Sequence, residues 1–245
     1  MADLSGKTAL VTGAARRVGR SIAEALARRG MNLALHFNRS RRESLALAAQ
    51  LRRSSGVRAE VFRADLRDVP EIKRMVARAA REMGGLWALV NNASLYVKTP
   101  FETATLKDWD DHMNANVRAP FFLAQAAAPH LRRSRGRIVN IVDWSALRPY
   151  ASFMPYCVSK AGLLCLNAAL AKELAPEVLV NAVLPGPVLL PESMSAGQRR
   201  AVQAATLLKR LGSPEEVAKA VAFFLESADF STGAALTVDG GRLIA

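Results

Sequence analysis

The sequence predicts a doubly wound α/β fold, a Rossmann-type parallel sheet of about seven strands with helices on both faces. Its 245 residues suffice for one large domain but are too few for two ordinary domains and a linker. Apolar, β-rich runs alternate regularly with segments of helical period, and no Pro/Gly/Ser-rich linker interrupts them. We therefore predict a single domain over residues 1–245.

The alternation defines each element in turn. Strands are predicted at residues 8–11, 32–37, 60–64, 88–91, 137–142, 178–184 and 235–238. Helices are predicted at residues 18–29, 42–53, 70–83, 106–131, 156–174 and 214–225. In the first helix Val18, Ile22 and Leu26 recur every four residues and form one buried stripe. Because right-handed βαβ units bind ligands beyond the carboxyl ends of their strands, functional residues should directly follow strands. The irregular stretch 185–198 predicts a substrate loop.

Composition excludes several classes of protein. Hydrophobic residues make up 51% and charged residues 22%, and no apolar run approaches 18 residues, which argues against disorder and a membrane span. The formal charge of +13 favours anionic ligands or partners. The basic residues come in short pairs typical of solvated helix faces, without a nucleic-acid-binding motif, so a nucleic-acid partner is not expected.

The N-terminus has no signal-peptide pattern, and we expect a cytoplasmic protein. Cys157 and Cys165 are eight residues apart on one predicted helix, about 12 Å, which is beyond disulfide reach. The three histidines are scattered singly, so no metal site is predicted.

The first strand ends in a turn suited to phosphate. Gly13 permits a tight turn, Gly19 allows the following helix to approach the sheet, and the helix N-terminus at Val18 offers free N–H groups. Arg16 and Arg17 add positive charge, and the Arg17 side chain can reach a phosphate or a substrate carbonyl. The turn predicts a dinucleotide-binding site.

The end of the second strand favours NADPH over NADH. NAD sites usually carry an acidic residue there for the ribose 2′-hydroxyl, yet no Asp or Glu occurs between Glu24 and Glu43. The strand instead ends with His36, Arg39 and Ser40, which can receive a 2′-phosphate together with Arg16.

Tyr156 and Lys160 are four residues apart, so they share one face of a helix. A nearby ammonium stabilises phenolate, and we expect Lys160 to lower the pKa of Tyr156 and make it a usable proton donor. The pair is accompanied by residues 91–94 after the fourth strand and by Asn116 in the next helix.

This ordered set, from Lys7 to Gly241, resembles the short-chain dehydrogenase/reductase family over essentially the whole chain. The resemblance implies a catalytic group of Asn116, Tyr156 and Lys160, and usually a homotetramer. It usually places a serine thirteen residues before the tyrosine, where this chain has Asp143; Ser145 lies two residues too late to replace it. The resemblance also implies that the dinucleotide contacts Asp65, Leu66, Asn92, Ala93, Pro185, Gly186 and Val188.

The departure at Asp143 resembles the pteridine reductase branch of the family, as do Arg17 and the His-x-x-Arg-Ser strand end. In that branch an aromatic residue matching Tyr96 and the nicotinamide hold the pterin ring between them, and Ser94 and Arg17 help to orient it. The resemblance therefore implies an NADPH-dependent reductase of a pterin-like C=N bond, with Asp143 and Tyr156 supplying the proton. Alternatives are a ketone or 3-oxoacyl reductase of the same family, a non-catalytic NADPH-binding regulator and a basic nucleic-acid-binding protein.

Overall fold

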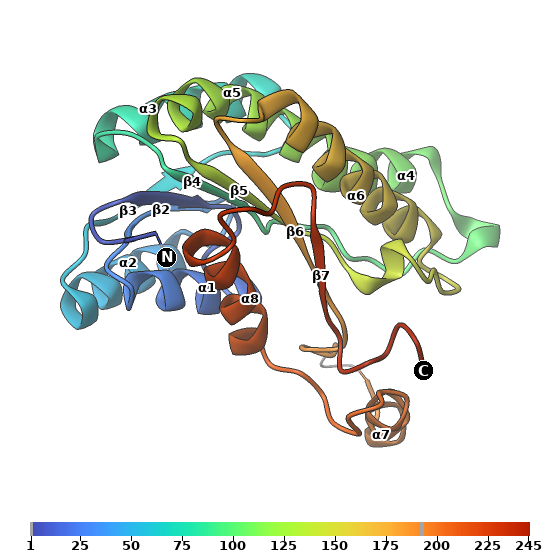
Figure 1. Cartoon of the computed structure of the whole chain (residues 1–245). Coiled ribbons are helices and arrows are strands. Elements are labelled where there is room, and N and C mark those ends of the chain that lie inside the picture. The colour runs from blue at the N-terminus through green and yellow to red at the C-terminus, as the bar shows by residue number, and fades with distance from the viewer. Residues whose placement is uncertain (1, 192–193) are drawn as a thin grey trace.

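A computed structural model describes residues 2–191 and 194–245, and it confirms the predicted doubly wound sheet (Figure 1). Seven parallel strands lie in the order β3-β2-β1-β4-β5-β6-β7. The strands are β1 (Thr8–Val11), β2 (Asn32–Phe37), β3 (Ala59–Arg63), β4 (Ala88–Asn91), β5 (Arg137–Ile141), β6 (Leu179–Pro185) and β7 (Ala235–Val238). The order reverses between β1 and β4, and this switch point opens a ligand crevice at the carboxyl ends of both strands.

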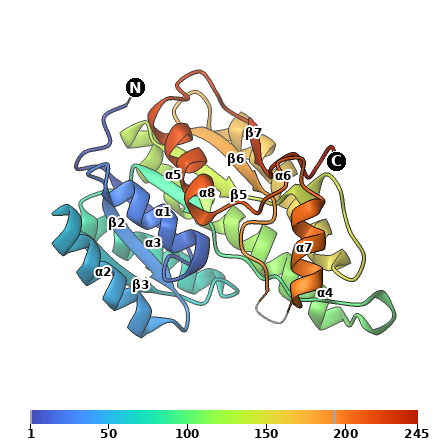
Figure 2. The same ribbon diagram turned by 90° about the horizontal axis from the view of Figure 1, so that it is seen from below.

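Helices cover both faces of the sheet (Figures 1 and 2). One face carries α1 (Arg17–Ala27), α2 (Arg41–Ser55) and α8 (Pro214–Glu226). The other carries α3 (Val69–Met83), α5 (Ala119–Ser134) and α6 (Met154–Leu174). Two apolar cores result because side chains alternate along each strand: Val11 of β1 enters the first core and Leu10 the second.

The long helix predicted at 106–131 is interrupted. It consists of α4 (Leu106–Met113), a π-helical turn (Asn114–Arg118) and α5. Pro120 has no N–H, so it cannot make the α-helical bond to the carbonyl of Asn116 four residues earlier. The wider turn therefore falls on a predicted catalytic residue, as π-turns often do at functional sites.

The loop predicted at 185–198 extends only to Ser195, because α7 (Ala196–Ala204) begins within it. Ser195 and Gln198 form a reciprocal capping box, a start signal that the Pro- and Ser-rich composition obscured. Residues 192 and 193 of this loop lie outside the described residues. The other expected helices and all the expected strands are present within a few residues of their predicted bounds.

Among the described residues, α6 alone combines the length and apolar composition of a membrane span. Half of its most apolar window is buried inside the fold, and the helix packs along β6. It also carries both Tyr156 and Lys160. These features are those of a core helix.

Candidate active site

The predicted site residues converge at the carboxyl ends of β1, β4, β5 and β6. In the turn after β1, Gly13 has φ +61°, a left-handed conformation that favours glycine. A Cβ atom at Gly19 would lie 2.3 Å from the Gly13 carbonyl oxygen and 2.5 Å from Asn92 Nδ2. The turn thus requires both glycines, and Asn92 fixes it by donating to the carbonyls of Thr12 and Gly13. Gly13 also packs against Ala93.

The two arginines of this turn have different partners. Arg16 forms an exposed ion pair with Glu43 at the start of α2. Arg17, at φ +53°, donates from its guanidinium to the Leu189 carbonyl, 3.0 Å away in the substrate loop. Val18 is partly buried against the apolar core. Arg16 is thus not the unpaired cation that the sequence suggested, and Arg17 bridges the turn and the loop after β6.

His36 corrects the sequence prediction most directly. Its Nδ1 accepts from the N–H of Gly13 at 3.1 Å, and its Nε2 lies 3.1 Å from the Ala64 carbonyl. This pairing sets the tautomer with the proton on Nε2. Burial lowers the pKa of His36 to about 4. The imidazole is therefore neutral and fully engaged near pH 7, and it braces the phosphate turn instead of offering charge to an anion.

Beside His36 lies a cavity of about 250 Å³, lined by Gly13, Ala15, Arg16 and residues 36–40. Arg39 is exposed there and makes no ion pair with any residue that the structure describes. Ser40 begins α2 without using its side chain as a cap. An unpaired guanidinium and a free hydroxyl in a cavity next to a phosphate turn fit the 2′-phosphate of NADP.

The remaining expected cofactor contacts lie at the same edge. The Asp65 carboxylate is held by Arg67, which keeps the pKa of Asp65 well below its usual range. Leu66 is buried beside it. After β6, Pro185 ends the strand, and Gly186 lies so close to Asp239 that a Cβ would be 2.5 Å from the Asp239 Cα. Val188 packs against the first core.

Helix α6 presents Tyr156 and Lys160 to the end of β5. Tyr156 is 5% exposed and Lys160 2%. The Lys160 Nζ donates to the carbonyl of Ile141 at 2.9 Å, and burial lowers the pKa of Lys160 to about 8. The ammonium lies 5.7 Å from the centre of the Tyr156 ring.

Asp143 follows β5 in extended backbone and faces both residues of this pair. It accepts from the N–H of Ser145 at 2.8 Å and hydrogen-bonds with the Tyr156 phenol. Burial raises the pKa of Asp143, although Ser145 and the Lys160 charge partly oppose this. Ser145 is itself buried and acts on Asp143, so it does not take the place of the missing serine.

The expected lowering of the Tyr156 pKa is wrong for this arrangement. Burial and then the negative charge of Asp143 raise the pKa of Tyr156 well above its ordinary value. Desolvation penalises the phenolate, and the nearby Asp143 carboxylate repels it. Tyr156 therefore keeps its proton at neutral pH, which suits a proton donor in a reduction.

Asn116 holds the segment after β4 against α6, at the same site, through four hydrogen bonds. Its side-chain oxygen accepts from the N–H of Leu95 at 2.8 Å and from the Ser94 hydroxyl at 3.1 Å. Its amide donates to the Leu95 carbonyl and, at 2.9 Å, to the Ser159 hydroxyl. The Asn116 side chain is thus saturated without touching Lys160, so its contribution is to hold the segment after β4 against α6.

Tyr96, at the end of that segment, is 45% exposed. Its ring lies edge-on to the Tyr156 ring, with 4.7 Å between centroids, and it stacks on Phe153 at 4.7 Å and 11°. Tyr96 therefore packs directly against Tyr156, and its role toward a substrate stays a prediction.

Comparisons with known proteins agree with this geometry. A family profile described as Enoyl-(Acyl carrier protein) reductase matches residues 13–242. The chain belongs to the short-chain dehydrogenase/reductase family. It is 34% identical to Nodulation protein G of a Rhizobium species over 98% of each chain. It is 32% identical to the 3-oxoacyl-[acyl-carrier-protein] reductase FabG of Staphylococcus aureus, over 96% of this chain and 97% of that one.

A solved structure is similar to this chain over nearly the whole of its length. The blue fluorescent protein from a metagenomic library, whose crystal structure is in complex with NADPH, matches with a TM-score of 0.92 and 34% identity over 98% of this chain and 99% of that one. As a member of this family, the protein is an NAD(P)-dependent oxidoreductase.

In this short-chain dehydrogenase/reductase, sequence reasoning missed three aromatic residues of the site. Phe153 backs Tyr96, and Tyr150 lies 5.4 Å from Phe153 and 3.5 Å, oxygen to oxygen, from the Tyr96 hydroxyl. Trp144 stacks on Tyr150 at 5.6 Å. One signal was available: the chain has three tyrosines, and all of them belong to this cluster.

The cysteines take no part in a disulfide. Cys157 is buried beside the catalytic helix face and Cys165 is exposed, and both are free. This agrees with their predicted separation.

Proposed function

We propose that this protein is an NADPH-dependent reductase of a pterin-like C=N bond, such as that of a dihydropterin or dihydrofolate. The observation that carries the proposal is the half-buried Asp143 carboxyl, hydrogen-bonded with Tyr156 where carbonyl reductases of the family usually have a serine. An ionised carboxylate repels the oxyanion that a ketone forms during hydride addition. A pterin presents ring nitrogens and an amino group, which a carboxyl can serve as acceptor or donor.

NADPH is the cofactor that best fits the residues. The 2′-phosphate would be held by Arg39 and Ser40, with Arg16 available if Glu43 releases it. The diphosphate would lie at the turn from Gly13 to Gly19, and Lys160 and Tyr156 would hold the nicotinamide ribose. When bound, NADPH supplies the hydride.

The protein residues then supply the proton and the orientation. Reduction of C=N requires one hydride at carbon and one proton at nitrogen. Tyr156, kept protonated by burial and by Asp143, holds that proton in the site. Asp143, whose pKa is raised, either passes the proton through Tyr156 or donates it in place of Tyr156. Tyr96 supplies a flat surface over the reaction centre, and Arg17 and Ser94 border the substrate side.

The second candidate is a 3-oxoacyl reductase, favoured by the resemblance to FabG. Under that function the basic surface would dock an acidic carrier protein. Asp143 weighs against it for the reason given above. A non-catalytic NADPH-binding regulator is less favoured, because Tyr156 and Lys160 remain together in a complete site. We also propose a cytoplasmic location and a single domain over residues 1–245.

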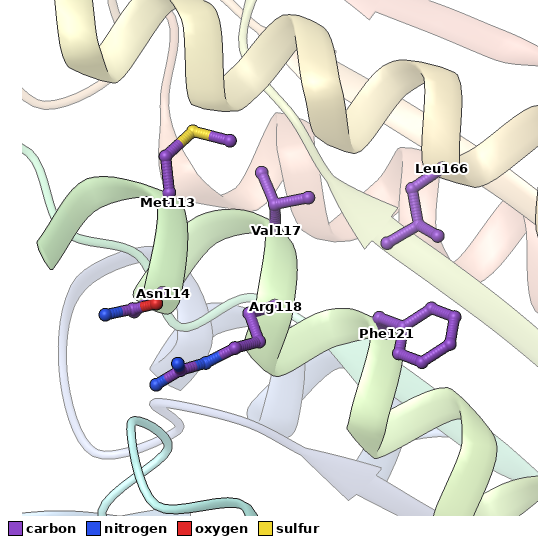
Figure 3. Close-up of a pocket in the computed structure, with 6 residues that line it drawn as sticks. All are labelled: Met113, Asn114, Val117, Arg118, Phe121 and Leu166. Atoms are coloured by element: carbon purple, nitrogen blue, oxygen red, sulfur yellow. The ribbon is translucent and has the colours of Figure 1, made fainter. Parts of the chain in front are cut away.

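Under this proposal the chain assembles with further copies of itself into a homotetramer. A cleft of about 270 Å³ lies where the π-helical turn meets α5 and α6 (Figure 3), and it is lined by Met113, Asn114, Val117, Arg118, Phe121 and Leu166. Phe121 is 40% exposed there. Burying such an apolar surface against a second copy would stabilise the assembly. Sedimentation of the purified protein measures its oligomeric state.

The function is tested by turnover of dihydrobiopterin, dihydrofolate and a 3-oxoacyl thioester side by side, each with NADPH and NADH. We expect the highest kcat/KM for a dihydropterin with NADPH. Preference for the thioester would replace the pterin proposal with the 3-oxoacyl one. No NADPH consumption with any substrate would support the regulator.

A further inference from the structure

The aromatic cluster extends beyond the residues needed to hold one ring. From Tyr96, which covers the reaction centre, it continues through Phe153 and Tyr150 to Trp144, with successive centroids 4.7, 5.4 and 5.6 Å apart. All four side chains are partly accessible. They form a continuous aromatic wall leading away from Tyr156.

The wall ends at a cation. The guanidinium of Arg242 lies 5.0 Å from the centre of the Trp144 ring. No carboxylate among residues 2–191 and 194–245 forms an ion pair with Arg242. The nearest acid in sequence, Asp239, is already engaged, because its two oxygens accept from the N–H groups of Gly241 and Leu243.

A second arginine fixes this cation in place. Arg148 follows Trp144 closely in sequence, and its Nη1 donates to the carbonyls of Arg242 and Leu243 at 3.2 Å and to that of Ala245. The turn after β7 is thereby hydrogen-bonded to the segment after β5. Arg148 thus uses Nη1 to hold the backbone that carries Arg242, and the Arg242 guanidinium is available to an anion.

We propose that Trp144, Tyr150 and Arg242 form a subsite for an aryl group bearing a carboxylate, attached to the ring that is reduced. The aromatic wall provides stacking surface for an arene, and the guanidinium at its end provides a bidentate partner for a carboxylate. A guanidinium already stacked on an indole is oriented before the ligand arrives, so less freedom is lost on binding. Together with the proposed function, on which the identity of the reduced ring rests, this subsite selects a folate-like substrate over an unconjugated pterin.

The subsite is tested first without turnover. 4-Aminobenzoylglutamate, which lacks the pterin ring, is titrated calorimetrically into the NADPH-loaded protein, with uncharged 4-aminobenzamide as the matched ligand. We expect binding of the carboxylate to weaken about tenfold in Arg242→Gln. Arg242→Lys should recover part of the loss, because it keeps the charge without the planar fork. Arg53→Gln, an exposed arginine on α2, controls for net charge.

Equal affinity of wild type and Arg242→Gln for 4-aminobenzoylglutamate would overturn the subsite. So would equal weakening by Arg53→Gln, which would show a general charge effect. The titration requires no turnover of a pterin. A negative result would therefore reject the subsite without bearing on the proposed function.

A kinetic arm then measures selectivity. The ratio of kcat/KM for dihydrofolate to that for dihydrobiopterin should fall about tenfold in Arg242→Gln, mainly through the KM for dihydrofolate. A ratio that matches wild type would reject the subsite even if both pterins are reduced.

Discussion

The two halves of the active site are built differently. On the cofactor side, the turn after β1 is fixed by internal hydrogen bonds: His36 receives the Gly13 N–H, and Asn92 donates to Thr12 and Gly13. On the substrate side, Asp143 is half-buried and Tyr156 is buried, and the pKa values of both are raised above their ordinary range. The first half is held by paired polar groups, whereas the second contains two acids whose charged forms are disfavoured. Substitutions should therefore separate binding from catalysis.

The largest effect is expected at Tyr156. Tyr156→Phe removes only the phenol hydroxyl and with it the proton, and general acid catalysis contributes about 10²–10⁴-fold, so kcat should fall by that factor. The Kd for NADPH, measured by fluorescence titration, should change less than about twofold. Tyr150→Phe is the matched control, because it removes a phenol from the same cluster and should cost far less. Wild-type turnover in Tyr156→Phe would remove this residue from the mechanism.

On the substrate side, replacing Asp143 should lower activity and raise the stability of the fold. Asp143→Asn and Asp143→Ser should lower kcat/KM for a dihydropterin by about 10- to 100-fold and that for an activated ketone little. The raised pKa of Asp143 means that its ionised form is disfavoured in the folded state. That penalty applies above the unfolded pKa and disappears as the pH falls below it. Asp143→Asn should therefore raise the Tm at pH 7 and not at pH 3.

A dihydropterin reduced normally by both Asp143 variants would contradict the pterin proposal. A lower Tm for Asp143→Asn at pH 7 would instead show that the carboxylate stabilises the fold.

On the cofactor side, Arg39→Gln should raise the KM for NADPH about 10- to 100-fold, since a hydrogen bond to a charged group is worth about 1.5–3 kcal/mol. The KM for NADH should hardly change, because NADH has no 2′-phosphate. Arg53→Gln again controls for net charge. Equal effects on both cofactors would place the 2′-phosphate elsewhere.

The smallest effect on turnover at neutral pH is expected at His36. The unfolded chain binds a proton at His36 below about pH 6.5, and the folded protein only below about pH 4. The free energy of unfolding should therefore fall as the pH drops through this window, by up to about 3 kcal/mol. His36→Gln should flatten that dependence in chemical denaturation, whereas His130→Gln should leave it unchanged. An identical slope in His36→Gln would show that the imidazole is not buried neutral.

Local patterns in the sequence were enough to predict the fold and the glycine turn after the first strand. The seven strands follow from alternating apolar runs, and the phosphate turn follows from Gly13 and Gly19, because only glycine fits those backbone positions. Family resemblance placed Asn116, Tyr96 and Asp143, and the structure brings Tyr96 and Asp143 against Tyr156. Family resemblance could not give the pKa values of these residues.

Tertiary structure alone decided what each polar group faces. His36 lies after a basic-looking strand end, yet folding buries it between Gly13 and Ala64 and makes it neutral. The Tyr156 pKa is set less by Lys160, four residues away, than by Asp143, thirteen residues away. Sequence spacing determines which side chains share a face of a helix or follow a strand. Charge, proton affinity and the aromatic wall ending at Arg242 depend on distances and desolvation between segments far apart in the chain, which only the folded structure defines.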